Sequence, residues 1–324
     1  MLSYFKSQQP PTVLAFIFLF VAVKIPFLIA SKIIPVSDVH NLWGSVGLLL
    51  SGSFLLNFLL AQICLMAQAI WFNYLFHKAD YHEGSSMIPA LYFTLVTSLI
   101  PQFNELSIYL LIGFILLLLF QTFLIVTVKE STKLECFNAG VLGGVLCVIN
   151  LNFLLFVPFL FLILYAIKPF RFNEYLMLLF GILFPFYLLL SVSYIADLFI
   201  NISAFSMVPF HFQTIYKSIP DFINLLLTGV YLLFSFISLR GIMYSTGFKR
   251  RKNLNMLIFY FVGMVLVILL SGHLDETVFA LLFIPVSIFL SLFMLRIRKK
   301  RLGEILNAIF VIVIFVTNIV RIFK

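Results

Sequence analysis

The chain has 324 residues, of which 63% are hydrophobic and only 10% are charged. Soluble domains have about 45–50% apolar and about 25% charged residues, so this composition excludes an ordinary soluble fold. The net charge of +9 does not indicate nucleic-acid binding, because the basic residues flank apolar stretches, where membrane orientation explains them.

About eleven apolar stretches are candidate membrane spans, since a helix needs about 20 apolar residues to cross the hydrocarbon core. In chain order they cover approximately residues 11–33, 53–76, 86–101, 107–128, 137–150, 152–168, 175–196, 219–239, 254–271, 277–296 and 303–320. The sequence therefore predicts an all-α, polytopic transmembrane helical bundle. We expect it to form a single integral membrane domain over residues 1–324.

The fifth and sixth stretches are the weakest of these predictions. Residues 137–150 are too few to cross the membrane comfortably as a straight helix. They and residues 152–168 form either two short spans or a re-entrant pair, and the latter is tolerated only under the cover of other helices. We favour two short spans, and either arrangement returns the chain to the same side at Lys168.

Lys and Arg residues are distributed unevenly between the two sides of this bundle. With a cytoplasmic N-terminus, the inward loops hold Lys6, Lys78, Lys129, Lys133, Lys168, Arg171, Arg240, Lys249, Arg250, Arg251, Lys252, Arg296, Arg298, Lys299, Lys300 and Arg301. The outward side holds only Lys32, Lys217, Arg321 and Lys324. Sixteen against four is the asymmetry expected from the positive-inside rule, so the N-terminus is predicted to be cytoplasmic.

Lys24 lies inside the first apolar stretch, where an ionisable group is costly and needs a partner. Its stem could reach the interface, or the ammonium could pair with an acid in the bundle. Alternatively, the ammonium faces a cavity that receives an anionic headgroup or phosphate. Pro26 follows it closely and could kink the helix.

The two longer polar breaks, residues 34–52 and 197–218, are both expected on the outward side. The first suits a helix lying in the interface, and the second suits a loop that dips into the outer leaflet. Asp38 and His40 could act there as general base and helper, or could hold a divalent metal ion. The alternative is a solvated loop in which Asp38 caps the following helix.

Other polar groups have simpler interpretations. His77, Asp80, His82 and Glu83 could bind a metal, but a short hydrated loop explains them better. The three cysteines have no CxxC spacing and predict neither a disulfide framework nor a zinc site. Candidates for hydrogen bonds between helices are Asn57, Gln62, Gln68, Asn73 and Gln121. The sequence contains no Walker loop, G-x-S-x-G or HExxH motif.

The layout resembles the GT-C class of polyprenyl-linked glycosyltransferases, because a first inside-to-outside span leads into an outward loop with an acid and an interfacial helix. The resemblance implies a GT-C-like core over residues 1–196, followed by the outward loop 197–218 and C-terminal helices over 219–324. It also implies that Asp38 is the essential acid of the first loop. This loop is shorter than is usual in that class and lacks a second acid nearby.

Three further segments resemble an uncharacterised polytopic inner-membrane family of Bacteroidota-type bacteria. These segments are SSMIPALYFTLVTSLIP, FNAGVLGGVLCVINLNFLLFVPFLFLILYAIKPFRFNEYL and LFGILFPFYLLL. This resemblance implies a multi-pass protein of the bacterial cytoplasmic membrane, without an assigned activity.

Two functions follow as hypotheses. The first is a glycosyltransferase that uses a polyprenyl-phosphate-linked sugar at the outer face, with Asp38 as the catalytic base. Its substrate-binding residues would be Lys24, His40, His211 and Lys217. The second is a non-catalytic subunit or scaffold of a cell-envelope assembly, with a lipid or solute carrier as a variant. We expect membrane lipids and membrane proteins as partners, and no cofactor unless a divalent metal ion binds.

Overall fold

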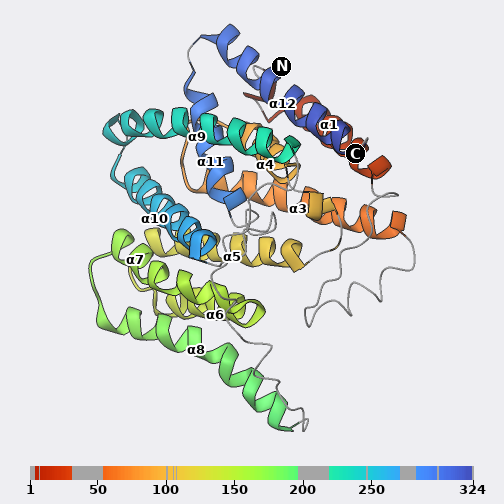
Figure 1. Cartoon of the computed structure of the whole chain (residues 1–324). Helices are drawn as coiled ribbons and strands as arrows, with labels where there is room; N and C mark the ends of the chain where they lie inside the picture. The colour runs from red at the N-terminus through yellow and green to blue at the C-terminus, as the bar shows by residue number, and fades with distance from the viewer. Residues whose placement is uncertain are drawn as a thin grey trace. The chain divides into compact units, whose positions relative to one another are not determined.

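A computed structural model describes residues 4–6, 8–30, 54–99, 101–104, 106, 108–195, 219–245, 247–270, 282–297 and 299–322 (Figure 1). All regular secondary structure in this part of the chain is helical. Seven of its helices are long and apolar enough to cross a membrane, which agrees with an integral membrane protein. The chain divides into two compact units, which are described separately below.

The first unit comprises residues 1–113, 215–245 and 286–324. Its elements are η1 (Tyr4–Lys6), α1 (Pro10–Ala30), α3 (Phe54–Lys78), α4 (Ile88–Thr97), η2 (Pro101–Asn104), the start of α5 (Ile108–Val128), α9 (Ile219–Ser245), most of α11 (Phe283–Arg296) and α12 (Lys300–Ile322). Helix α12 packs against α1 and α9, and α3 packs against α4. A buried hydrogen bond also joins α4 to α12, from Tyr92 Oη to Asn307 Oδ1.

The second unit comprises residues 114–214 and 246–285. Its elements are the rest of α5, α6 (Lys133–Ile149), η3 (Leu151–Phe156), α7 (Val157–Ile167), α8 (Phe172–Ile195) and α10 (Phe248–Leu270). Helix α6 packs along α8, and α10 packs on α7 and η3. The ring of Tyr260 on α10 contacts Phe120 and Phe156, which fills the space between three elements.

The eleven predicted stretches divide into long and short helices. The seven long helices are α1, α3, α5, α8, α9, α10 and α12, and each falls on a predicted span. The other four stretches hold the shorter helices α4, α6, α7 and α11. The exact number of crossings therefore stays a prediction for these four segments.

Helix α4 is the clearest departure from the predicted span at residues 86–101. It has 10 residues, and all of them are buried. At 1.5 Å per residue it is about 15 Å long, half of the roughly 30 Å hydrocarbon core. Hydroxyl groups in and just after the helix bond locally: Thr94 Oγ1 donates to the carbonyl of Ala90, and Ser98 Oγ, one residue past the end, donates to that of Thr94. A helix covered by protein on every side needs no membrane-spanning length.

Helices α6 and α8 run parallel, because Thr132 meets Glu174 near their starts and Gly140 meets Gly181 further along. A methyl group added at Gly181 would collide with the carbonyl oxygen of Phe137 and lie 2.9 Å from the α-carbon of Gly140. The two backbones therefore touch directly, as small residues permit in membrane helices. Pro185, inside α8, packs against Gly144 in the same interface.

The return between α6 and α8 is made by η3 and α7. Helix α6 ends at Ile149, and Asn150, which follows it, is extended and exposed. At the end of α7, Lys168 Nζ donates to the carbonyl oxygens of Lys129 and Glu130. The chain thus returns to the end at which α6 begins, as expected, while the choice between two short spans and a re-entrant pair stays a prediction.

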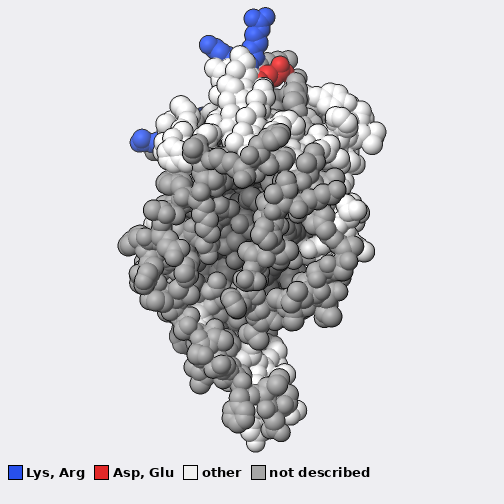
Figure 2. All heavy atoms as spheres, turned by 45° about the vertical axis from the view of Figure 1, so that its right-hand side comes forward, with Lys and Arg blue, Asp and Glu red and all other residues white. Residues whose placement is uncertain are grey.

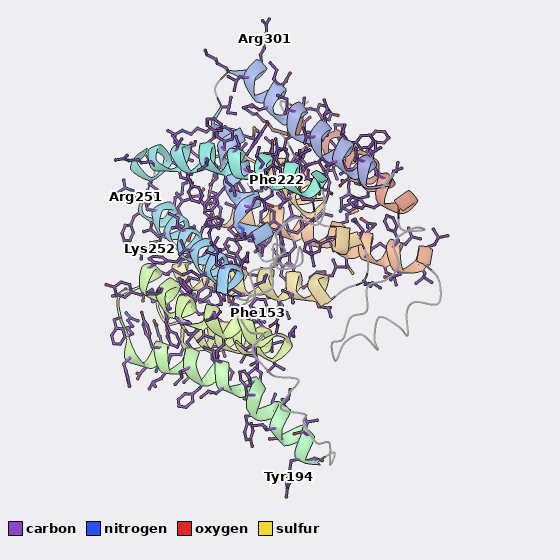
Figure 3. All side chains as sticks on the ribbon, viewed as in Figure 1. Phe153, Tyr194, Phe222, Arg251, Lys252 and Arg301 are labelled. Carbon is purple, nitrogen blue, oxygen red and sulfur yellow. The ribbon has the colours of Figure 1, made fainter. Side chains whose placement is uncertain are left out.

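Basic residues open three of the described helices, although the helix dipole disfavours cations at this end by about 0.3–1 kcal/mol. Lys133 begins α6, and Lys300 and Arg301 begin α12. Figure 3 also shows Arg251 and Lys252 in the first turns of α10. At the far end of another helix, α8, the same figure labels Tyr194. On the face shown in Figure 2, Lys and Arg stand at the margin of the described surface. Membrane orientation explains this placement better than helix stability does.

Candidate functional site

Lys24 is the only predicted site residue within the described part of the chain. It lies on α1 with 2% of its surface exposed. Its Nζ donates to Asn104 Oδ1 at 3.0 Å, and it lies 5.6 Å from the ring centroid of Phe27. Among the described residues no carboxylate is ion-paired with it. Dipoles and a π face, rather than an acid, therefore surround this ammonium group.

Asn104 is held in place by polar side chains of α3. Gln62 Nε2 donates to the same Asn104 Oδ1 at 3.4 Å. Two residues further on, the backbone N–H of Leu106 donates to Asn57 Oδ1 at 2.8 Å. Gln68 Nε2 donates to the carbonyl of Leu110 at 2.8 Å. The prediction of hydrogen bonds between helices is confirmed for Gln62 and Gln68, whereas Asn57 bonds to the turn between η2 and α5.

The remaining predicted site residues are Asp38, His40, His211 and Lys217. They lie outside the described residues, as do both outward segments in which they occur. The proposed base and all of the predicted donor contacts, including that of Lys24, therefore stay predictions.

The cluster around His77 forms a turn. His77 Nε2 lies 2.8 Å from the carbonyl oxygen of Ser86, which closes the connection between α3 and α4. Asp80 adopts a left-handed backbone with φ of 57°. Within the described residues, no three His, Cys, Asp or Glu side chains gather as they would around a metal ion. The choice between a hydrated loop and a metal site stays a prediction.

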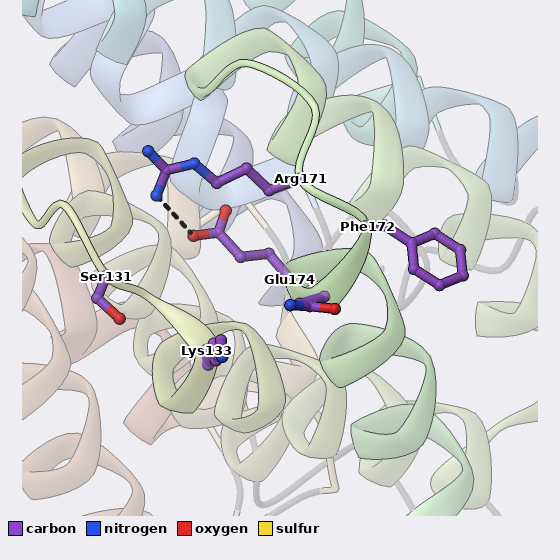
Figure 4. Close-up of a pocket in the computed structure, with 6 residues that line it drawn as sticks. Ser131, Lys133, Arg171, Phe172 and Glu174 are labelled. Carbon is purple, nitrogen blue, oxygen red and sulfur yellow. Dashed lines mark ion pairs between the residues drawn. The ribbon is translucent and has the colours of Figure 1, made fainter.

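A second polar site, which the sequence analysis did not identify, lies at the charged end of the second unit (Figure 4). It is a hollow of about 320 Å³ beside the first turns of α6 and α8. The residues that line it are Ser131, Lys133, Arg171, Phe172, Asn173 and Glu174. It combines two cations with a carboxylate that is almost fully buried.

Glu174 is the buried member of this site, with 3% of its surface exposed. Its Oε1 accepts a hydrogen bond from Thr132 Oγ1 at 2.9 Å. The guanidinium of Arg171 lies 3.9 Å from the same oxygen, beyond hydrogen-bond distance (Figure 4). The other oxygen, Oε2, has no hydrogen-bond partner among the described residues. One oxygen of this carboxylate is thus buried without a hydrogen bond from the described residues.

Beside the hollow, Lys129 Nζ donates to Glu135 Oε1 at 2.5 Å. This hydrogen bond lowers the pKa of the Glu135 carboxyl. Glu135 is therefore ionised at neutral pH and compensates Lys129, which leaves Lys133 and Arg171 as the cations of the hollow.

The sequence contained a signal for this site: Glu174, an acid near the start of α8, follows Arg171 by three residues. Lys168 and Arg171 were interpreted only as markers of orientation, because nothing local places α6 parallel to α8. The glycines at 140, 144 and 181 were a second signal, since the first two have the small-xxx-small spacing of close helix contacts.

Comparison with protein-family models, with curated proteins and with solved structures finds no match for this chain. The functional argument therefore depends on the chemistry of its own residues.

Proposed function

We propose that this integral membrane protein transfers a sugar from a polyprenyl-phosphate donor at the outward face of a bacterial cytoplasmic membrane. The observation that carries the proposal is Lys24, a buried cation whose partners among the described residues are neutral. It lies fourteen residues before Asp38 in the sequence. A phosphate is the ligand that would best compensate such a cation, because charge-assisted hydrogen bonds are the strong ones.

In the proposed reaction, Asp38 accepts the proton of a hydroxyl group on the acceptor. The oxygen of that hydroxyl group attacks the anomeric carbon of the sugar at the same time. The bond between that carbon and the phosphate oxygen breaks, and polyprenyl phosphate leaves with the bonding electrons. Lys24 stabilises the charge that grows on the leaving phosphate. His40, His211 and Lys217 are proposed as further donor contacts from the outward segments.

The first test measures binding of the leaving group, which is common to every donor of this class. Purified protein is mixed with undecaprenyl phosphate or with the uncharged polyprenol, and retained lipid is counted by native mass spectrometry. We expect preferential retention of the phosphate, reduced about ten-fold or more by Lys24→Met. The exposed Lys78 provides the control variant Lys78→Met, which should bind normally.

The second test measures transfer from radiolabelled polyprenyl-phosphate sugars in proteoliposomes. The variant Asp38→Asn preserves shape but removes the base, so it should retain the lipid and lose transfer. Equal retention of polyprenol and its phosphate would contradict the proposal and favour a non-catalytic scaffold. Full transfer by Asp38→Asn would rule out Asp38 as the base.

A further inference from the structure

The hollow in the second unit has the elements of an anion site. Helices α6 and α8 both begin beside it. The first backbone N–H groups of a helix have no acceptor within the helix, and the helix dipole makes this end positive. Lys133 and Arg171 add two formal charges. A phosphate is the group that such an end attracts.

Glu174 distinguishes this hollow from a site for a simple anion. It is almost fully buried, and one of its oxygens has no donor within the described residues. An unsatisfied buried acceptor is costly, and the cost is larger for a charged group. A ligand that fits both the basic residues and Glu174 carries a phosphate beside a hydrogen-bond donor, preferably a cationic one.

We propose that this hollow binds the headgroup of phosphatidylethanolamine, a lipid in which a phosphate stands beside a primary ammonium. The phosphate contacts Lys133, Arg171 and the starts of α6 and α8. The ammonium donates to the carboxylate of Glu174, which lines the hollow and has one unsatisfied oxygen. A volume of about 320 Å³ lies at the lower end of the range of about 300–1,000 Å³ for ligand sites.

The surroundings of the hollow favour a lipid over a soluble ligand. Phe172 lines it and is 63% exposed. Along α8, the span that follows is only 17% buried within the protein, with exposed Phe180 and Leu183. A headgroup in the hollow would therefore leave its acyl chains beside a helix that already faces lipid, at the depth where aromatic residues are common.

The test compares lipids that differ in the ammonium group. The full-length protein is purified in detergent and mixed with phosphatidylethanolamine, phosphatidylcholine or phosphatidylglycerol, and retained lipid is measured by native mass spectrometry. We expect phosphatidylethanolamine to be retained about ten-fold better than phosphatidylcholine, whose quaternary nitrogen has no N–H to donate. Equal retention of these two lipids by the wild-type protein would overturn the proposal.

Variants distinguish binding of the ammonium group from binding of the phosphate group. Glu174→Gln should abolish the preference for ethanolamine over choline while both lipids are still retained. Arg171→Met and Lys133→Met should weaken retention of all three lipids. The control is Lys129→Met, since Lys129 pairs with Glu135 and does not line the hollow. An undiminished preference in correctly folded Glu174→Gln would reject Glu174 as the ammonium partner.

A final arm distinguishes the lipid from a free headgroup. Soluble phosphoethanolamine is added to the detergent-solubilised protein, and its thermal midpoint is compared with that in the presence of the lipid. Stabilisation by the lipid at far lower concentration supports the proposal. Stabilisation by phosphoethanolamine without retention of the lipid would overturn the assignment to a membrane lipid.

Discussion

Lys24 in the first unit and Glu174 in the second are buried side chains that carry a charge. Their hydrogen-bond partners among the described residues are neutral groups. The ammonium of Lys24 is bonded to a neutral amide oxygen. The carboxylate of Glu174 is bonded to a hydroxyl group and lies 3.9 Å from a guanidinium group that is mostly exposed. Burying an ionised group is costly unless it is paired and hydrogen-bonded. Both positions are therefore where the ligands proposed above would add a compensating charge.

The Lys24–Asn104 pair leads to a prediction about stability. Asn104→Ala should destabilise the protein by about 1.5–3 kcal/mol, because it leaves the ammonium without its acceptor. Lys24→Met should have a smaller effect, since Asn104 still accepts from Gln62. Combining the two should cost less than the sum of the single changes, because the buried charge is gone.

These three variants can be compared with wild type in a double-mutant cycle of unfolding in mixed micelles. Additive effects would show that Lys24 and Asn104 are not coupled. A large loss from Lys24→Met alone would indicate that the ammonium stabilises the fold.

At the scale of helices, the α6–α8 contact depends on the absence of side chains. Gly181→Ala should destabilise the protein by about 1–3 kcal/mol, because the new methyl group has backbone atoms as neighbours and cannot be accommodated by a rotamer change. Gly229→Ala on α9 is a matched control, since its methyl group would meet nothing within 4 Å. That control should be neutral or should stabilise by up to about 1 kcal/mol through helix propensity.

Thermal midpoints of the purified glycine variants, measured by scanning fluorimetry in one detergent, would test this contrast. Equal midpoints for Gly181→Ala and wild type would mean that α6 and α8 are not in backbone contact.

The short helix α4 depends on a hydrogen bond to α12. Tyr92 Oη donates to Asn307 Oδ1 at 2.9 Å in a buried environment. Tyr92→Phe should cost about 1–3 kcal/mol, because it leaves a buried acceptor without its donor. Tyr187 on α8 is 67% exposed, so Tyr187→Phe should change the thermal midpoint little. Similar effects of the two substitutions would contradict a role for this bond.

At the scale of the whole chain, the distribution of Lys and Arg predicts which loops are cytoplasmic. The native cysteines are Cys64, Cys136 and Cys147, and single cysteines would be introduced in a background that lacks them. An impermeant thiol reagent applied to intact cells should label a cysteine at Ser37 but not one at Ser131. After the membrane is opened, both should react. The reverse pattern in intact cells would invert the orientation.

The sequence predicted the seven long helices because lipid imposes a minimum apolar length, which can be read locally. It predicted a longer helix at α4 than the structure has, because a segment surrounded by protein is as apolar as one surrounded by lipid. The position of Lys24 within a span was predicted, but its acceptor was not, because Asn104 lies 80 residues away and is brought near only by packing. The hollow beside Glu174 was missed because it requires the parallel alignment of α6 and α8.

The buried position of α4 also has a consequence for the order in which the protein is made. Two of its covering bonds, Tyr92 to Asn307 and Asn318 to the carbonyl of Ser98, span 215 and 220 residues. A ribosome releases α4 long before α12 exists, so the nascent chain carries a half-length helix without its final cover. Helix α12 thus completes the cover of α4, and a chain truncated before α12 would lack both of these bonds.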